Sequence, residues 1–283
     1  MKKIISIILA LTMVCSLALV FTSCTEDNTG ANEESSTEAE AAGSMTATEG
    51  VLVMATNAAF PPYEYVEGGE YAGIDVEIAE KIAEKLGMTL EIKDVDFGAI
   101  IGGVQSGKFD MGMAGMTVTE DRLKSVNFST TYATGIQVVI VAEDSAITSL
   151  DDLKGDGSMK FGVQQDTTGD IYASSSVEDG GYGEDNVIRY KTGADAVQAL
   201  KSGKVDAVII DNEPAKSFVA ANEGLKILDA EWAVEDYAIA IAKENTALLD
   251  AVNKALAELT ADGTIAAIIA KYIPSAETAS EAA

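Results

Sequence analysis

From residue 51 onward the chain alternates short apolar runs with amphipathic stretches, and this alternation restricts its fold more than any other feature. An apolar run bounded by turn residues favours a strand, whereas apolar residues three and four apart favour a helix. The first set has strands expected at 51–56, 90–92 and 109–113, and helices expected at 75–86 and 97–105. Regular alternation of this kind is typical of a mostly parallel sheet covered by helices on both faces. The sequence therefore predicts an α/β fold.

Turn and cap signals divide this first set. The two prolines at 61–62 end the first strand, and the two glycines at 68–69 predict the turn of a hairpin. Asp75 is placed to cap the first helix, and Gly87 is placed to end it.

A second set of the same kind begins near Ile136. Its strands are expected at 137–141, 160–163, 187–190, 205–210 and 237–242, and its helices at 149–153, 169–174, 194–201, 213–221, 246–261 and 264–271. Two sets totalling about 225 residues fit two lobes better than one very large sheet. A single doubly wound sheet, as in many enzymes, is the alternative.

The N-terminus has the pattern of an export signal. Residues 1–23 combine two lysines, an apolar run over 4–20 and small residues before Cys24, and acidic residues follow. This ending resembles the lipobox of bacterial lipoproteins, in which the cysteine carries the lipid. The alternative is a plain secretory signal with an incidental cysteine. Cys15 is interpreted as part of the apolar run.

Residues 25–48 are rich in Ser, Thr, Ala, Gly and Glu and contain no base. Such a stretch cannot bury enough surface to offset its ordering entropy, so residues 24–48 are predicted to be the lipidated cysteine and a flexible tether. A coil of this length would hold the folded body roughly 25 to 30 Å from the lipid. We therefore expect the body to work at the outer face of the cytoplasmic membrane. Residues 275–283 are predicted to be a loose tail.

Charge and residue content exclude several functions. The chain has 19 Lys and Arg against 46 Asp and Glu, so nucleic acid is not an expected partner. There is no histidine, which removes Ser-His and Cys-His nucleophilic sites and the commonest transition-metal ligand. We expect no metal site and no cofactor. Carboxylate or lysine chemistry remains possible, so an enzyme is less favoured rather than excluded.

Two charged residues could hold the two ends of a free amino acid, which needs a cation for its carboxylate and an anion for its ammonium. Arg122 follows an expected strand, and its guanidinium matches a carboxylate. It could instead be a surface arginine paired with Glu120 or Asp121. Asp211 follows the strand at 205–210 and could meet an ammonium. By local sequence, a cap for the next helix is the better interpretation of Asp211.

Weaker signals come from a turn and from two aromatic rings. Residues 165–169 join a strand to a helix, and their N–H groups would suit a carboxylate, as in every turn of this type. Phe60 and Phe97 each follow an early strand and could cover a ligand side chain. Rings at such positions otherwise belong to the core.

Three segments together resemble family 3 of the bacterial extracellular solute-binding proteins, the polar amino-acid receptors of ABC importers. They are Gly73–Leu86 (GIDVEIAEKIAEKL), Ala114–Arg122 (AGMTVTEDR) followed by Val126–Ser129, and Val205–Asp211 (VDAVIID). The resemblance runs from about Val51 to Ile273, with the motifs in the family's order. It implies a periplasmic-binding-protein-like α/β fold, with two doubly wound lobes, a two-segment hinge and the ligand in the cleft.

The resemblance also implies how the chain divides. Residues 49–134 and 236–274 would form the first lobe, and residues 135–235 the second. The chain would cross between the lobes near 132–135 and near 234–237, and the lobes would close on the ligand by hinge motion.

The family's residue roles carry over to matching positions. The arginine matching Arg122 clamps the ligand carboxylate together with N–H groups at Thr117 and Thr168. The aspartate matching Asp211 takes the ammonium with the carbonyl of Gly115 and the hydroxyl of Thr117. The full set of expected ligand-binding residues is Asn57, Phe60, Phe97, Ala114, Gly115, Thr117, Arg122, Thr167, Thr168 and Asp211.

One departure bears on specificity. Asn57 stands where several family members, including receptors for basic amino acids, have aspartate. We therefore expect a neutral polar ligand such as glutamine rather than lysine, arginine or ornithine.

The leading interpretation is a monomeric transport receptor without chemistry, with a free amino acid, ABC transporter permease subunits and the membrane, through lipid on Cys24, as partners. Similar folds include dehydratases, for which Glu64, Asp96 or Asp170 could serve as acid or base. A ligand-sensing receptor for a separate signalling partner is the third possibility.

Overall fold

The computed structural model describes residues 45–154 and 157–274, all of which belong to one compact unit. The predicted signal peptide, the lipidated Cys24, the tether up to residue 44 and the tail at 275–283 lie outside these residues. Within the described ranges, no helix is long and apolar enough to cross a membrane.

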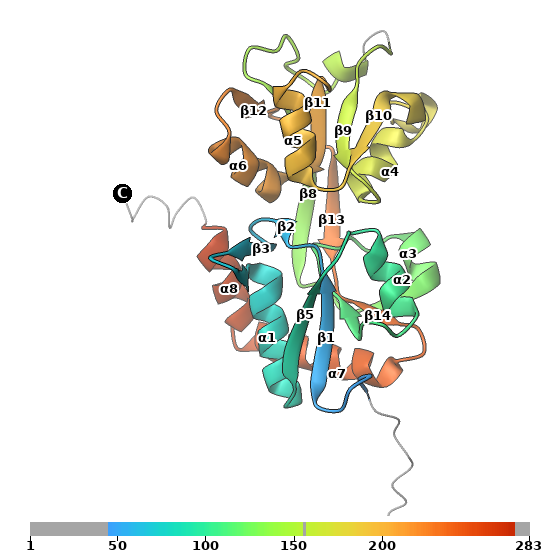
Figure 1. Cartoon of the computed structure of the whole chain (residues 1–283), viewed down its shortest axis with the longest axis vertical. Helices are drawn as coiled ribbons and strands as arrows, with labels where there is room; N and C mark the ends of the chain where they lie inside the picture. Colours follow the sequence, from blue (N-terminus) through green and yellow to red (C-terminus); the bar gives the residue numbers. More distant parts are fainter. Residues whose placement is uncertain (1–44, 155–156, 275–283) are drawn as a thin grey trace, which may run out of the picture. The chain divides into compact units, whose positions relative to one another are not determined.

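The first sheet has the strand order β5-β1-β6-β14-β7 (Figure 1). Its strands are β1 (Val51–Thr56), β5 (Thr89–Asp94), β6 (Met111–Gly112), β7 (Val126–Phe128) and β14 (Ala240–Ala242). The first three run parallel, whereas β14 is antiparallel to both of its neighbours. We call this sheet, with its helices and a hairpin, lobe 1. The helices are α1 (Ile74–Leu86), α2 (Ala99–Gln105), α3 (Glu120–Ser125), α7 (Thr246–Ala261) and α8 (Thr264–Tyr272), and the hairpin comprises β2 (Ala59–Phe60), β3 (Glu64–Glu67) and β4 (Glu70–Ala72).

The second sheet, lobe 2, repeats this plan with the order β10-β9-β11-β8-β12. Its strands are β8 (Ala133–Ala142), β9 (Phe161–Gln164), β10 (Val187–Tyr190), β11 (Ala207–Asp211), β12 (Leu225–Ile227) and β13 (Ala233–Tyr237). Its helices are α4 (Thr168–Ser174), α5 (Gly193–Lys201) and α6 (Asn212–Ala221), with short 3-10 turns at Asp152–Lys154, Val177–Asp179 and Glu184–Asn186. Again three strands are parallel and the fourth, β8, is antiparallel to its neighbours. The predicted α/β fold with two lobes is confirmed.

Two strands run side by side between the sheets (Figure 1). β8 and β13 pair antiparallel, from Ala133 opposite Tyr237 to Gln137 opposite Ala233. They lie at the two crossings expected from the sequence. A pair of hydrogen-bonded strands can bend as a unit, so this ribbon has the form of a hinge.

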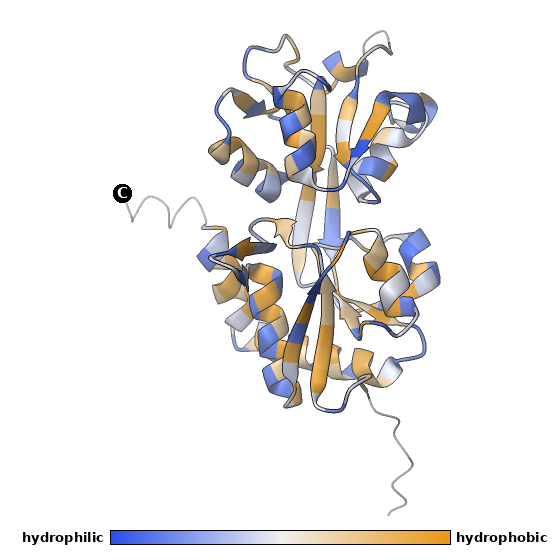
Figure 2. Cartoon of the chain, in the orientation of Figure 1, coloured by the Kyte–Doolittle hydropathy of each residue, from blue (hydrophilic) through white to orange (hydrophobic). Residues whose placement is uncertain are grey.

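Each sheet is buried on both faces, as parallel sheets require. Side chains alternate along a strand, so Leu52 and Met54 pack with α1 and α7, whereas Val53 and Ala55 pack with α2 on the other face. Figure 2 shows β1 as largely hydrophobic, and the helices as a mixture of hydrophobic and hydrophilic residues.

Three local predictions need correction. Asp75 does not cap α1, because Gly73 occupies the cap position and no side chain caps the helix there. A side chain at residue 73 would clash with the carbonyl of Tyr63. The helix expected at 149–153 is only a 3-10 turn. The strand expected at 237–242 is two strands, because the chain passes there from the hinge ribbon into the lobe 1 sheet.

The last residues of the predicted tether are packed against lobe 1. Thr46 is buried, and the backbone N–H of Ala47 donates to the carboxylate of Asp110 at 2.9 Å. The side-chain amide of Asn245 donates to the carbonyl of Met45 at 2.8 Å. Residues 45–48 therefore belong to the folded body, because these contacts join them to segments far away in the sequence.

Candidate ligand-binding cleft

A cavity between the lobes comprises about 310 Å³ of space not filled by protein atoms, including solvent space at its opening. The residues that line it include all ten expected from the sequence, together with Glu64 and Gln164, which were not expected there. They come from lobe 1 (Asn57, Phe60, Glu64, Phe97, Ala114, Gly115, Thr117, Arg122) and from lobe 2 (Gln164, Thr167, Thr168, Asp211). The cavity lies where the carboxyl ends of parallel strands in the two sheets face each other, the usual ligand site in open α/β sheets.

Arg122 is held at the cavity by backbone carbonyls of both lobes. Its Nη1 donates to the Thr117 carbonyl at 2.8 Å, and its Nη2 donates to the Asp166 carbonyl at 3.0 Å. The guanidinium lies 5.2 Å from the centre of the Phe97 ring. Burial lowers the pKa of Arg122, while the charges of Glu235 and Asp211 act in the opposite direction.

Within the described residues, Arg122 forms no ion pair with a carboxylate. Asp121, one of the alternative partners, pairs with Lys124 instead. Because a guanidinium carries about five N–H donors, donors remain available beyond the two carbonyl bonds. Arg122 is the only basic residue among those that line the cavity in the described ranges.

Asp211 ends β11 and occupies the cap position of α6, but its side chain makes no cap hydrogen bond to a described residue. Instead its Oδ1 accepts a hydrogen bond from the Tyr237 hydroxyl. The local signal that favoured a capping side chain was therefore misleading. Burial, and next the nearby charge of Glu235, raise the pKa of Asp211 to about 7. A positive ligand group would favour the ionised carboxylate.

Glu235, on β13, was missed by the sequence analysis although it lies beside the cavity. Its Oε2 accepts hydrogen bonds from the hydroxyls of Thr117 at 3.2 Å and Thr168 at 2.9 Å, and from Nε2 of Gln137 at 2.9 Å. A signal was available, because an acid within a predicted crossing between lobes must lie near the cleft.

An amide pair crosses the cavity from lobe to lobe. Nε2 of Gln164 donates to Oδ1 of Asn57 at 2.9 Å, and Nδ2 of Asn57 donates to the Val95 carbonyl at 2.8 Å. Both side chains are buried. The position of Asn57 therefore holds a neutral hydrogen-bonding group where an aspartate would place a charge.

Glu64 and Asp75 form a buried acid pair at the lobe 1 wall. Burial, with a smaller effect of Asp75, raises the pKa of Glu64 well above its usual value. Oδ2 of Asp75 accepts from the Gly115 N–H and from the Tyr132 hydroxyl, both at 2.8 Å. Burial raises the pKa of Asp75 to about 6, although the Gly115 bond opposes this. Asp75 thus connects helix α1 to the cavity loop and to the first hinge strand.

Of the three acids considered for dehydratase chemistry, Glu64 alone lines the cavity. Asp96 is exposed and pairs with Lys191, and Asp170 is bound by the guanidinium of Arg189. Within the described residues, no group of three or more Cys, His, Asp or Glu side chains could hold a metal ion.

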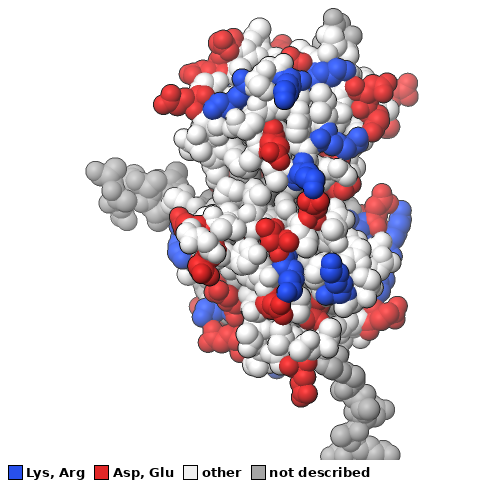
Figure 3. Space-filling model, viewed as in Figure 1, with Lys and Arg blue, Asp and Glu red and all other residues white. Residues whose placement is uncertain are grey.

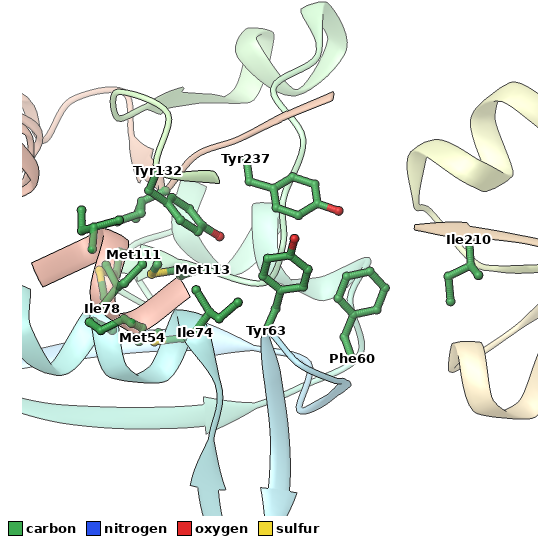
Figure 4. Packing of buried hydrophobic residues seen from close by; sticks show 14 of the residues in the cluster. Met54, Phe60, Tyr63, Ile74, Ile78, Met111, Met113, Tyr132, Ile210 and Tyr237 are labelled. Carbon is green, nitrogen blue, oxygen red and sulfur yellow. The ribbon is translucent and has the colours of Figure 1, made fainter. Parts of the chain in front are cut away.

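Aromatic rings close one side of the cavity. The Phe60 ring stacks on Tyr63 with centroids 6.0 Å apart, and Tyr63 meets Tyr237 edge-on at 5.1 Å. Figure 4 shows the hydroxyls of Tyr63 and Tyr237 directed into the same region, with Ile210 of lobe 2 facing them. Gly115 has a φ of 51°, and a Cβ there would lie 2.9 Å from the Phe60 ring. A glycine is therefore required for the ring to approach the cavity loop.

Figure 3 shows acidic and basic side chains interspersed over both lobes on the face in view. The cavity lining combines a cation, Arg122, with the acid Asp211, and the charges of Asp211 and of the nearby Glu235 act on Arg122.

A family model described as bacterial extracellular solute-binding proteins, family 3, matches residues 52–275. The arginine-binding extracellular protein ArtP of Bacillus subtilis is 34% identical over 224 residues, which are 78% of this chain and 85% of ArtP. An ancestral arginine-binding protein solved with glutamine is 39% identical with a TM-score of 0.73, and the match covers 81% of this chain and all (100%) of the other. The ancestral protein solved with arginine is 41% identical with a TM-score of 0.72, covering 79% and 98%.

Proposed function

Because the chain belongs to family 3 of the bacterial extracellular solute-binding proteins, we propose that it is the substrate-binding protein of an amino-acid ABC importer. The observation that carries this proposal is the arrangement of Arg122 and Asp211 in one closed cavity. A free amino acid has one negative and one positive group at fixed separation, and these two residues have the opposite charges. The named relatives are binding proteins, which gives no support to the dehydratase alternative.

At the carboxylate end, Arg122 would exchange one or both of its carbonyl partners for the ligand. The N–H groups of Thr117 and Thr168 would add two further bonds. A bidentate guanidinium–carboxylate contact in a buried cavity is among the stronger polar contacts available to a protein. Arg122 therefore supplies most of the orientation of the ligand.

At the ammonium end, Asp211 would accept from the ligand with the Gly115 carbonyl and the Thr117 hydroxyl. In the empty cavity, with a pKa of about 7, Asp211 holds a proton in about half of the molecules at neutral pH. Binding a positive group favours the ionised form, so ligand uptake should release part of this proton.

For the side chain we propose a neutral polar ligand such as glutamine. Asn57, Gln164 and Glu64 also line the cavity, and burial raises the pKa of Glu64 well above its usual value, which favours the neutral form of its carboxyl group. The two amides are neutral and offer both donors and acceptors. A primary amide, which also has both, complements them without an unpaired charge.

Arginine is the second candidate, and Glu64 is the observation that favours it. A guanidinium next to Glu64 would lower the pKa of that carboxyl group and form a buried ion pair. Part of the binding energy would be used to ionise Glu64 beside Asp75, which lies within hydrogen-bond reach of it. The similarity to arginine-binding relatives points in the same direction.

For location and partners, the proposal depends on the sequence before residue 45. A lipid on Cys24 would hold the monomer at the outer face of the cytoplasmic membrane, next to the permease subunits of the importer. The folded body begins by Met45 because Met45 and Ala47 are bonded to lobe 1. The tether would therefore be residues 25–44.

The test is a thermal-shift screen of the chain without residues 1–23 and with Cys24→Ser, against the twenty amino acids, ornithine and cystine. A ligand at one hundred times its Kd should stabilise the fold by about 2.7 kcal/mol. Calorimetric titration then ranks glutamine against arginine. Absence of binding by any of these compounds would overturn the proposed function.

A further inference from the structure

Glu235 brings three parts of the molecule to a single oxygen atom. Its Oε2 accepts from Thr117 in the loop after β6, from Thr168 at the start of α4, and from Gln137 on β8. Thr117 belongs to lobe 1 and Thr168 to lobe 2, whereas Glu235 and Gln137 lie on the two strands of the hinge ribbon. The two threonines line the cavity and Glu235 lies behind them.

A buried carboxylate at this position lowers the stability of the fold, so its presence suggests a role in function. Glu235 is 4% exposed, and within the described residues its Oε1 is buried without a hydrogen-bond partner. The Oε1 of Gln137 is in the same situation. Burying a charge for structure alone is often no better than an apolar side chain of similar size, and a buried oxygen without a partner calls for an explanation, of which a functional role is one.

The charge of Glu235 acts on both residues proposed to hold the ligand. After burial, the charge of Glu235 has the largest effect on the pKa of Arg122. The same is true of the pKa of Asp211. The other titratable groups whose charges couple to Asp211 are Tyr237, Tyr63, Tyr172, Glu64 and Arg122. Burial raises the pKa of all three tyrosines, and that of Glu64, which favours their neutral forms. Among the described residues, Glu235 is the charge that raises the pKa of Asp211 most, after burial.

We propose that Glu235 is a positioning residue for amino-acid binding, which ties one cavity threonine of each lobe to the second hinge strand and so sets the separation at which the lobes hold a ligand. This inference rests on the proposed function and adds a residue outside the cavity lining. When the lobes separate, Oε2 must release Thr117 or Thr168. When they close, the same oxygen orients both residues, whose N–H groups are the proposed carboxylate donors.

The test compares Glu235→Gln with Asp236→Asn in the soluble chain. Asp236 is the exposed neighbour on the same strand, so its substitution removes the same charge without touching the cavity. Affinity for L-glutamine and for L-arginine is measured by calorimetry at pH 6 and pH 8.

Wild-type protein and Asp236→Asn should both bind about tenfold more weakly at pH 6 than at pH 8, because one proton must leave Asp211. Glu235→Gln should bind about tenfold more weakly than the control at pH 8. For this variant, the ratio of the affinity at pH 8 to the affinity at pH 6 should fall below about threefold, because loss of the neighbouring charge lowers the pKa of Asp211. A merely structural role would not change this ratio, and a variant that matches Asp236→Asn in affinity and ratio overturns the inference.

A measurement without ligand separates this inference from the proposed function. Hydrogen–deuterium exchange at Thr117 and Thr168 should be about tenfold faster in Glu235→Gln than in Asp236→Asn. If neither amino acid binds the wild-type protein, the proposed glutamine or arginine specificity fails, whereas the exchange rates still decide the role of Glu235. Equal rates in the two variants contradict it.

If Glu235→Gln does not fold, the role of Glu235 is tested by comparing Thr168→Ser with Thr168→Val. Serine keeps the hydroxyl that donates to Oε2, and valine removes it with little change in shape. An affinity about tenfold lower in the valine variant than in the serine variant supports the inference. Equal affinities overturn it.

Discussion

The two lobes have the same strand order but place buried acids in opposite surroundings. In lobe 1, Asp75 accepts from the Gly115 N–H and the Tyr132 hydroxyl with Glu64 nearby, and burial raises the pKa of both acids. At the lobe 2 side, Asp211 lies near Glu235 and Arg122, with a pKa of about 7. Through Asp75, the first pair joins helix α1 to the hinge. Asp211 is close to its midpoint at neutral pH, where a ligand charge can change its state.

This contrast shows that burial alone does not decide what an acid does. Asp75 and Asp211 are both deeply buried. Asp75 accepts from Gly115 and Tyr132, two donors inside lobe 1 and its junction with the hinge. Asp211 accepts from Tyr237 and lines the cavity between the lobes. We therefore expect Asp75 to matter for stability and Asp211 to matter for binding.

The largest effect is expected for Arg122→Ala, which removes the cation that lies near Asp211. Affinity for the amino acid should fall by about 4 kcal/mol, because a ligand carboxylate would be buried without a partner. Calorimetry measures the loss. Arg189→Ala is the control, since Arg189 pairs with Asp170 and Glu184 outside the cavity. Equal affinities in the two variants would remove Arg122 from the site.

The next effect is expected for Asp211→Asn. Affinity should fall by about 3 kcal/mol because the ammonium loses its charged acceptor. The melting temperature of the empty protein should change little, since no cap bond is lost. Glu213→Gln, at the first turn of the same helix, is the control. A large drop in melting temperature with unchanged affinity would show a structural role and erase the contrast with Asp75.

A smaller effect is expected for Asp75→Ala, and it should appear in stability. The Gly115 N–H and the Tyr132 hydroxyl would be left buried without an acceptor, which costs about 2 kcal/mol or somewhat more in the free energy of unfolding. Urea unfolding measures this, with Glu80→Ala on the exposed face of α1 as the control. If the cavity loop keeps its position, affinity for the ligand falls less than in Asp211→Asn. The reverse order would contradict the proposed division of roles.

The smallest effect concerns pH. The folded pKa of Asp211 is raised, so its contribution to stability is fully present below the unfolded pKa and is lost as pH rises through about 7. From pH 8 to pH 6 this group should stabilise the empty protein by about 1.4 kcal/mol. Asp75, with a pKa of about 6, should contribute only about 0.4 kcal/mol over the same interval.

Thermal unfolding of the empty wild-type protein and of Asp211→Asn at both pH values measures the difference. The variant should lose about 1.4 kcal/mol of the stabilisation at pH 6. An identical pH dependence in the two proteins would mean that Asp211 is ionised throughout, as an acid with a nearby cation would be.

Local patterns predicted most of the elements because strands and helices are specified by nearby residues. The helix at 246–261 matches α7, and the strand at 51–56 matches β1. The misassignments have tertiary causes. The hydrogen bonds of Asp75 to Gly115 and Tyr132 take it away from the cap position. The passage from β13 to β14 divides a single apolar run between two sheets.

The cavity residues were predictable to the extent that they follow strands. Asn57, Gly115 and Asp211 each lie at the carboxyl end of a strand, where an α/β sheet places its ligand. Glu64 was named only as a possible acid for chemistry, because its position in a hairpin gives no local sign of the cavity. Gln164 is the last residue of β9, and it was missed although it lies at the carboxyl end of a strand. The reason is that the expected strand ended at residue 163 and no ligand role was given to the residue that follows.

The sequence by itself determined the two-lobed α/β plan, the strand ends that form the cleft and the scarcity of cations within it. These depend on spacing, turn residues and composition, which act over a few positions in the chain. The tertiary structure decided the partners and charge states of the acids. Thr117 and Glu235 are 118 residues apart, and Gln137 and Glu235 are 98 apart. Contacts at such separations exist only after the chain has crossed twice between the lobes, so no local pattern could encode which oxygen meets which donor.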